Sequence, residues 1–364
     1  MEILSVDLEN YRNYNKIHVD FHKKANIILG SNGQGKTNLL ESIYLASFGK
    51  SFRASKDKEL IKFNSEFCRV STHFLKDDEP GNIDIAINKD GKKGIKVDGV
   101  SIKKVSQLME NIYVVIFSPE DLKIIKDEPS RRRSFIDREL CKLKISYFDN
   151  LSNYKKVLLQ RNTYLKGYKI DDEFLTIWDI ELAKYGAKII SQRKDFIKKL
   201  SDISKVIHKN ITGNKEELEI RYMPNIPIEM TLEALTESFQ KTLVINRHVD
   251  KSHRTTSRGP HKDDLKILIN NIDCRKYGSQ GQQRTAALSL KLAEIELIKQ
   301  EKNENPILLL DDVMSELDSS RQNFLIETLS DIQMFITTTE LTDDVLKNIK
   351  NAKILNIKNA SIDG

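Results

Sequence analysis

The chain has 364 residues, enough for two domains that each bury a core, and it shows neither a signal-peptide pattern nor an apolar run of membrane-spanning length. Its 59 basic and 53 acidic residues nearly balance, and the net charge of +6 permits a polyanionic partner without requiring one. Because its three cysteines are scattered, without a Cys-x-x-Cys or Cys/His cluster, we expect a cytoplasmic protein with no disulfide framework and no cysteine–histidine metal site. The lack of a membrane-spanning apolar run predicts no membrane contact.

The first third of the chain is predicted to be mainly β-structure, because apolar and polar residues alternate there. A strand at Asn26–Leu29 runs directly into a glycine-rich segment, and a helix from about Gly35 to Ser47 follows. The other expected strands are 3–8, 16–21, 67–75, 83–87, 94–97 and 112–117.

The glycine-rich segment has the form G-x-x-x-x-G-K-T, which is typical of a phosphate-binding loop. Its glycines allow the backbone N–H groups to point at phosphate oxygens, and the following helix adds its positive end. Lys36 would reach the β- and γ-phosphates, and Thr37 would hold Mg²⁺. The alternative is a chance glycine-rich turn, which the strand before and the helix after argue against. The candidate nucleotide-binding residues are Gly30, Ser31, Asn32, Gly33, Gln34, Gly35, Lys36 and Thr37.

Between about Glu120 and Val249 the pattern becomes helical. From Leu182 to Lys209 apolar residues recur at three- and four-residue steps, which places them on one helix face. The opposite face carries Lys184, Lys194, Lys198, Lys205 and Lys209. These lysines are candidates for DNA-phosphate contacts, and the alternative is an ordinary solvated helix face.

The last third returns to alternating strands and helices, which gives an α/β layout with a helical insertion in its middle. The expected elements are strands at 265–270, 307–311 and 334–338, and helices at 281–300 and 318–329. Four apolar residues precede Asp311 and Asp312, so both carboxylates would lie at the carboxyl end of a buried strand. Asp311 would hold Mg²⁺, and Asp312 would orient or deprotonate the attacking water. An acidic turn is the alternative.

A polar segment, Tyr277 to Arg284, precedes the helix that leads to the carboxylate strand. Ser279, Gly281 and Gln282 would form a second anion-binding surface at that helix N-terminus. Alone, the segment also fits a polar turn with a capping serine. Its position upstream of the carboxylate strand resembles the signature motif of the ATP-binding-cassette (ABC) superfamily. The loop from Ser315 to Asp318 resembles the S-x-L-D loop of the same superfamily.

Motifs along nearly the whole chain are similar to those of the RecF family of bacterial DNA-repair proteins. They are Leu8–Tyr14, Pro119–Leu122, Pro129–Asp137 and Arg258–Leu265. The resemblance implies an ABC/SMC-type ATPase head of residues 1–125 plus 255–364, a mostly helical lobe of residues 126–254, and no long coiled coil. It adds Arg12 and Asp318 to the nucleotide contacts and implies ATP and Mg²⁺ as cofactors.

The resemblance also implies a head-to-tail homodimer that forms with ATP, in which the phosphate loop of one subunit meets Ser279 of the other. Such a dimer would clamp double-stranded DNA near single-strand gaps and help RecO and RecR to load RecA. Hydrolysis would then release the DNA. The alternatives are another ABC-type ATPase, such as a transporter, a nuclease-associated head, or a binding module with a purely structural ATP site.

Two departures from the wider superfamily predict slow hydrolysis, and the resemblance implies that DNA stimulates it. Asp312 stands where most cassette ATPases have a glutamate, and Thr337–Thr339 stands where they have a switch histidine. Among other basic residues, Arg131, Arg132 and Arg133 are candidate DNA contacts, but they could instead bind carboxylates of the lobe or act near the nucleotide. His261 could be a structural turn histidine or a sensor that faces the site.

Overall fold

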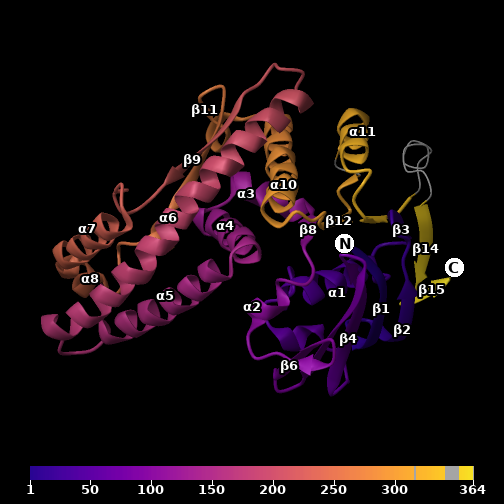
Figure 1. Cartoon of the computed structure of the whole chain (residues 1–364), viewed down its shortest axis with the longest axis horizontal. Helices are drawn as coiled ribbons and strands as arrows, with labels where there is room; N and C mark the ends of the chain where they lie inside the picture. Colours follow the sequence, from indigo (N-terminus) through magenta and orange to yellow (C-terminus); the bar gives the residue numbers. More distant parts are fainter. Residues whose placement is uncertain (315–316, 341–351, 364) are drawn as a thin grey trace. The chain divides into compact units, whose positions relative to one another are not determined.

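The computed structural model describes residues 1–314, 317–340 and 352–363. By their internal contacts they form two compact units, which are Met1–Asp121 with Ile298–Gly364, and Leu122–Leu297. The predicted division into 1–125 plus 255–364 and 126–254 differs from these units over residues 122–125 and 255–297, and it stays a prediction. Figure 1 gives the order of the elements along the chain.

The first unit contains two six-stranded sheets. One is antiparallel with strand order β2-β1-β4-β5-β6-β7, and the other has the order β15-β14-β3-β13-β12-β8. Its elements are β1 (Glu2–Tyr11), β2 (Tyr14–Asp20), β3 (Ala25–Leu29), α1 (Lys36–Phe48), η1 (Asp57–Leu60), β4 (Phe67–Lys76), β5 (Glu79–Asn88), β6 (Lys93–Val97), β7 (Val100–Ser101), α2 (Val105–Leu108), β8 (Val114–Phe117), η2 (Pro119–Asp121), β12 (Ile307–Asp311), α11 (Ser319–Thr328), β13 (Met334–Thr338), β14 (Ala352–Lys358) and β15 (Ser361–Asp363).

The second sheet positions the predicted site because β3, β12 and β13 are parallel neighbours. Leu309 pairs with Phe335, which in turn pairs with Asn26, so these three strands end at the same edge. Strand β12 is buried along its whole length, as its unbroken apolar run predicts. One hydrophobic core unites α1 with strands of both sheets.

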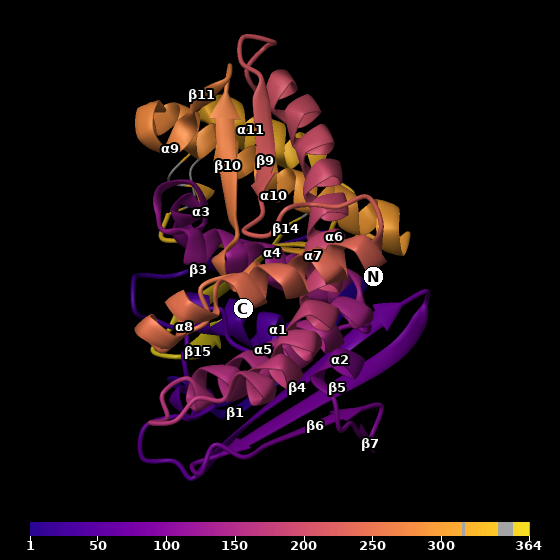
Figure 2. The ribbon, with the colours of Figure 1, turned by 90° about the vertical axis from the view of Figure 1, so that its left-hand side faces the viewer.

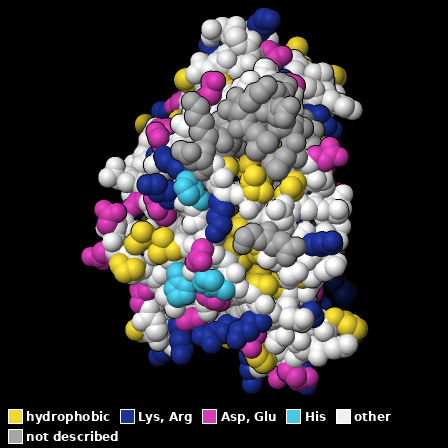
Figure 3. Space-filling view, turned by 90° about the vertical axis from the view of Figure 1, so that its right-hand side faces the viewer, with side chains coloured by type: hydrophobic (Ala, Val, Ile, Leu, Met, Phe, Trp, Pro, Cys, Tyr) yellow, Lys and Arg dark blue, Asp and Glu magenta, His cyan; other side chains and the backbone are white. Residues whose placement is uncertain are grey.

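One face of the first unit, shown in Figure 3, gathers histidine and acidic side chains. On the antiparallel sheet His18 Nδ1 lies 2.8 Å from Asp7 Oδ1, and His18 Nε2 lies 3.1 Å from Asp20 Oδ1. His73 Nε2 lies 3.5 Å from Asp7 Oδ2. Within the described part of the chain, no group of His, Cys, Asp and Glu side chains forms a metal cluster, and no helix is long and apolar enough to cross a membrane.

The second unit is mostly helical, and its long helix α6 is about 60 Å in length from its 40 residues. Its elements are α3 (Leu122–Lys126), α4 (Pro129–Leu143), α5 (Ile145–Tyr164), α6 (Asp172–Ile211), β9 (Leu218–Met223), α7 (Leu232–Ile245), α8 (Arg247–His253), η3 (Pro260–Lys262), β10 (Asp264–Ile269), β11 (Ile272–Asp273), α9 (Cys274–Tyr277) and α10 (Gln280–Lys302), the last of which continues past Leu297.

The helical pattern predicted for residues 120–249 misses β9, which pairs antiparallel with β10 (Figure 2). Leu218 and Ile220 are buried and alternate with more exposed residues, so this short segment has a period of two. Helices α5 and α7 both pack against α6.

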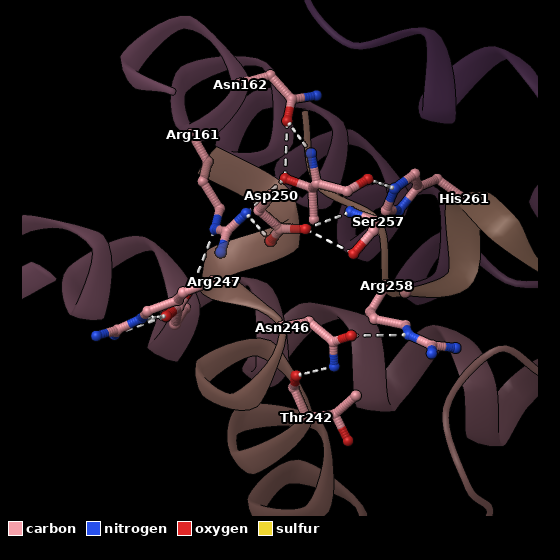
Figure 4. A network of polar contacts seen from close by, with 12 residues as sticks. Arg161, Asn162, Thr242, Asn246, Arg247, Asp250, Ser257, Arg258 and His261 are labelled. Atoms are coloured by element: carbon pink, nitrogen blue, oxygen red, sulfur yellow. Dashed lines mark hydrogen bonds and ion pairs between the residues drawn. The ribbon is translucent and has the colours of Figure 1, made fainter. Parts of the chain in front are cut away.

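A buried ion network holds α5, α6 and α8 together (Figure 4). Arg161, Asp179 and Asp250 have fully buried side chains, and Arg161 Nε donates to Asp179 Oδ1 at 2.8 Å. Arg161 Nη1 donates to Asp250 Oδ2 at 2.7 Å and to Thr256 Oγ1 at 2.8 Å. Such a network is costly to break, because a removed partner leaves an uncompensated buried charge.

A second buried network joins α4 to α10. Lys142 Nζ lies 2.9 Å from Glu139 Oε2 and 3.1 Å from Glu294 Oε1, and Lys291 also pairs with Glu294. Burial and repulsion from Glu139 raise the pKa of Glu294 to about 7. Burial alone would raise the pKa of Glu139 too, but attraction to Lys142 and other neighbouring groups holds it well below its usual value.

We expect Glu294 to make stability depend on pH. Its folded pKa exceeds the ordinary value of 4.5, so the folded state binds the extra proton between these two values. The free energy of unfolding should therefore fall as pH rises from about 5 to about 7, by at most about 1.4 kcal/mol per pH unit. Urea unfolding of Glu294→Gln should lack this fall, whereas the exposed control Glu237→Gln should keep it. An unchanged pH dependence in Glu294→Gln would contradict the assignment.

Candidate functional site

The phosphate loop has the backbone geometry that its glycines predict. Gly33 and Gly35 have φ angles of 81° and 122°, a region that L side chains rarely adopt. A Cβ on Gly35 would lie 2.7 Å from Tyr14 Oη, and one on Gly30 would lie 2.5 Å from the carbonyl oxygen of Ile357. Close packing therefore requires glycine at positions 30 and 35. The middle of the loop, Ser31 to Gly33, remains exposed.

Three residues that the sequence prediction left without a role hold the loop in place. Asn13 Nδ2 donates to the carbonyl of Gln34 at 2.9 Å, and Tyr14 Oη donates to the carbonyl of Gly35 at 3.0 Å. The backbone N–H of Asn359 donates to Gln34 Oε1 at 2.5 Å. Gln34, a predicted nucleotide contact, thus links the loop to the turn between β14 and β15.

Lys36, the first residue of α1, is 4% exposed and points back into the loop. Its Nζ donates to the carbonyl oxygens of Gly30 at 2.7 Å and of Ser31 at 3.3 Å. Among the residues that the structure describes, no carboxylate forms an ion pair with it. A positive charge held only by carbonyl dipoles is suited to an anionic ligand.

Thr37 and Asp311 lie together, as the sequence predicts. Thr37 Oγ1 donates to Asp311 Oδ1 at 2.8 Å, and Thr337 Oγ1 lies 3.1 Å from the same oxygen. Burial raises the pKa of Asp311, and the hydrogen bonds from both threonines oppose that rise. A hydroxyl and a carboxylate are the oxygen ligands that Mg²⁺ prefers, so these two residues fit a magnesium ion beside a phosphate loop.

Asp312 follows with a φ of 54°, which turns the chain away from β12 immediately after the buried carboxylate. Its N–H donates to Thr337 Oγ1 at 2.9 Å. Thr337 Oγ1 lies 3.5 Å from Asp312 Oδ1, so the single hydroxyl proton of Thr337 can serve Asp311 or Asp312 but not both. Thr337 belongs to the triplet that replaces a switch histidine, and sequence reasoning gave it no positive role.

Arg12, a predicted nucleotide contact, is engaged by protein groups. Its Nε and Nη2 each donate to a carboxylate oxygen of Glu41 at 2.7 Å, and its Nη1 donates to the carbonyl of Glu59 at 2.8 Å. The bonds to Glu41 raise the pKa of Arg12. A nucleotide contact from Arg12 would therefore compete with a bidentate carboxylate pair.

The predicted signature segment forms the N-terminus of α10 in the second unit. Ser279 N–H donates to Gln282 Oε1 at 2.9 Å, and Gln282 N–H donates to Ser279 Oγ at 3.2 Å, which is a reciprocal capping box. Ser279 and Gly281 are exposed, so the start of a 23-residue helix faces solvent in this unit. Ser279 therefore caps this helix, and the exposed N-terminus of α10 could still bind an anion.

Asp318 caps the N-terminus of α11, and its side chain accepts from the N–H of Arg321 at 3.0 Å. It also accepts from Ser320 Oγ at 2.6 Å and pairs with the Arg321 guanidinium. Ser315 and Glu316, which belong to the predicted S-x-L-D loop, lie outside the described residues.

The arginine run does not act as one surface. Arg132 is 2% exposed and forms a bidentate pair with Asp264, with Nε–Oδ1 at 2.6 Å and Nη2–Oδ2 at 3.0 Å. It is therefore unavailable to DNA, which corrects the prediction for this residue. Arg133 is half-buried, and its Nη1 donates to the carbonyl of Asp263 at 2.8 Å. Arg131 is exposed.

The lysine face of α6 is exposed, but part of its charge is neutralised within the protein. Lys205 and Lys209 both form ion pairs with Glu217, at 2.6 Å and 3.1 Å. Lys184 pairs with Glu181 at 3.3 Å. In the described part of the chain, Lys194 and Lys198 have no such partner, so they are the stronger candidates for DNA contacts.

His261 is a structural residue of the turn that precedes β10. Its Nε2 lies 3.0 Å from the carbonyl oxygen of Thr256, which can only accept, so Nε2 carries the proton. Its Nδ1 then accepts from Tyr154 Oη at 2.7 Å. Burial lowers the pKa of His261 to about 4, so it is neutral at physiological pH.

The chain is similar to known proteins along its whole length. The family model "RecF/RecN/SMC N terminal domain" matches residues 2–361. The DNA replication and repair protein RecF of Clostridioides difficile (strain 630) is 48% identical over 364 residues, which cover 100% of this chain and 98% of that protein. RecF of Alkaliphilus oremlandii (strain OhILAs) is 46% identical, covering 96% of each chain.

Solved structures give the same result. The structure described as the recombination mediator protein RecF with ATP in the RecFOR pathway has a TM-score of 0.93 at 38% identity, and the match covers 100% of this chain and 97% of that one. An Smc head bound to the C-terminal winged-helix domain of ScpA has a TM-score of 0.56 at 16% identity, which shows a shared fold alone. The predicted ABC/SMC-type head fold, without a long coiled coil, is thereby confirmed.

Proposed function

Because the chain belongs to the RecF family of DNA replication and repair proteins, we propose that it is an ATP-dependent DNA-binding protein whose subunits pair head to tail around ATP and Mg²⁺. The Thr37–Asp311 hydrogen bond carries the nucleotide part of this proposal, since it joins the phosphate loop to the carboxylate strand with magnesium-type ligands. Relatives described as RecF with ATP support it.

In this proposal each side chain has a defined role. The loop N–H groups and Lys36 bind the phosphates, while Thr37 and Asp311 hold Mg²⁺, which neutralises phosphate charge when bound. Asp312 orients the attacking water. Asp312 is one carbon shorter than a glutamate, and Thr337 cannot accept a proton as an imidazole can. Slow, DNA-stimulated hydrolysis follows, so ATP acts as a switch for DNA binding and release.

The signature serine supports a two-subunit site. Ser279 is exposed at a capped helix N-terminus, which is suited to a phosphate presented by another chain. Dimerisation and ATP binding would then be thermodynamically linked. The DNA contacts would be phosphate contacts from Lys194, Lys198 and Arg131, close to single-strand gaps. RecO and RecR are the proposed partners, and the RecFOR pathway named for the solved relatives supports this.

A complementation experiment tests the two-subunit site. Lys36→Ala and Ser279→Arg should each lose ATP hydrolysis alone. In an equal mixture, about half of the dimers contain one subunit of each variant. Each mixed dimer has one site with both an intact loop and an intact signature, and its other site carries both substitutions. Hydrolysis should therefore return to about a quarter of the wild-type rate. Phosphate release with gapped duplex DNA is the measurement, and light scattering with and without ATP reports the dimer.

The same measurements separate the alternatives. A mixture that recovers no hydrolysis would refute the shared site, and DNA cleavage would favour a nuclease. If the wild-type protein hydrolyses no ATP with or without gapped DNA, the result would favour a binding module whose nucleotide is purely structural.

A further inference from the structure

The second unit contains a partly enclosed pocket to which the proposed function gives no role. It has a volume of about 230 Å³ and lies between α4, α5, α6 and η3. Leu151, Tyr154 and Pro260 supply apolar surface, and Ser130 and Ser134 belong to the first turns of α4. Its charged lining consists of Arg133, Asp137, Lys155 and Arg193.

Both carboxylates near the pocket are already satisfied by protein donors. Arg193 Nη2 donates to Asp137 Oδ1 at 2.7 Å, and Arg193 Nη1 donates to Asp263 Oδ2 at 2.8 Å. Tyr147 Oη donates to Asp137 Oδ1 at 2.5 Å, and Tyr222 Oη donates to Asp263. Arg193 is 1% exposed, so this arrangement forms the fixed back wall of the pocket.

Arg133 brings a further positive charge, which attraction from Asp264, Asp263 and Asp137 offsets in part. A guanidinium has five N–H donors, and among the described residues Arg133 donates a hydrogen bond only through Nη1, to the backbone carbonyl of Asp263. Burial lowers the pKa of Arg133, and repulsion from Arg193 lowers it further. The Lys155 ammonium adds a second charge, being 64% exposed and 3.8 Å from Asp137 Oδ2.

The shape and chemistry of the pocket select a small anion. Its volume lies below the roughly 300 Å³ at which pockets for whole small-molecule ligands begin. A half-buried guanidinium with free donors matches the oxygen geometry of phosphate, and the N-terminus of α4 adds positive potential behind Ser130. The positive charges of Arg133 and Lys155 disfavour a metal cation in this pocket. His261 is neutral and adds no charge to it.

We propose that this pocket binds a phosphate group, held by Arg133 and Lys155 against the wall formed by Arg193. The phosphate comes either from a nucleic-acid strand end or from free inorganic phosphate. The strand-end source rests on the proposed DNA-binding function, whereas the inorganic-phosphate source does not.

Isothermal titration with inorganic phosphate tests the pocket in the absence of DNA, using the full-length protein. Arg133→Gln should weaken phosphate binding about 10- to 100-fold, which is the usual cost of a lost charge-assisted hydrogen bond. Arg258→Gln is the matched control, because this exposed arginine of the same unit lies outside the pocket and its variant should bind phosphate as the wild type does. Lys155→Gln, at an exposed position, replaces Arg133→Gln if that variant fails to fold.

A second arm uses duplexes that differ only in whether their strand ends carry phosphate or hydroxyl. If a strand end is the source, the wild type should prefer the phosphorylated duplex, and Arg133→Gln should lose the preference while retaining ATP binding. A difference between the pocket variants and the control, in phosphate binding or in preference for phosphorylated ends, supports the phosphate site. If Arg133→Gln, Lys155→Gln and the control Arg258→Gln behave equally in both arms, the proposed phosphate site is wrong, even if ATP-dependent DNA binding is intact.

Discussion

Replacing Lys36 by alanine is expected to reduce ATP hydrolysis by a factor on the order of 10² to 10³. The reason is that its ammonium is a preorganised charge, held by the carbonyls of Gly30 and Ser31 with 4% exposure, so water cannot substitute for it. Phosphate release in the presence of Mg²⁺ and gapped duplex DNA measures the effect.

Lys58→Ala is the matched control, since Lys58 is an exposed lysine of η1 in the same unit. It should hydrolyse ATP at the wild-type rate. Thermal unfolding of both variants shows whether the fold is retained. A correctly folded Lys36→Ala protein with more than about a tenth of the wild-type rate would contradict the role assigned to Lys36.

Replacing Arg161 by methionine should destabilise the second unit by about 3 to 5 kcal/mol. Asp179 would keep a partner in Arg247, whose Nε donates to Asp179 Oδ2 at 2.9 Å. Asp250 would lose its cation and retain only the N–H and hydroxyl of Ser257, at 2.8 Å and 2.6 Å. A fully buried, unpaired carboxylate is the source of the expected loss (Figure 4).

The chain offers a local probe for this experiment, because its single tryptophan, Trp178, precedes Asp179 on α6. Tryptophan fluorescence during urea unfolding therefore reports the second unit. Arg258→Met removes an exposed arginine of the same unit and should change the free energy of unfolding by less than about 0.5 kcal/mol. If Arg161→Met is as stable as Arg258→Met, the buried network contributes nothing to stability.

The sequence predicted the site best where function depends on local chain geometry. The phosphate loop and the strand that ends in Asp311 are each contiguous, so glycine spacing and an apolar run were enough to place them. Asn13, Tyr14 and Asn359 were missed because their bonds to the loop come from other parts of the fold, which are the start of β2 with the turn before it and the turn after β14. The competing partner of Arg12, Glu41, likewise lies on a different element, and charge alone could not identify it.

The same limit applies to the fold and the basic surfaces. Strands of the antiparallel sheet in the first unit, such as β4, alternate clearly, but β9 is short and gains its stability from pairing with distant β10. In β14 only Leu355 and Ile357 are buried, so its pattern was too weak to predict a strand. In the sequence Arg132 could not be distinguished from Arg131 and Arg133, because its partner Asp264 lies far along the chain.

The position of β3 has a consequence for the synthesis of this protein. Its two neighbours in the sheet, β13 and β14, are translated near the end of the chain, and the turn after β14 supplies the N–H that holds Gln34. A ribosome therefore produces the phosphate loop early but cannot complete its surroundings until residue 359 has emerged. Chains that end before β14 would lack this neighbouring strand and the hydrogen bond from Asn359, so their phosphate loop would be incompletely supported.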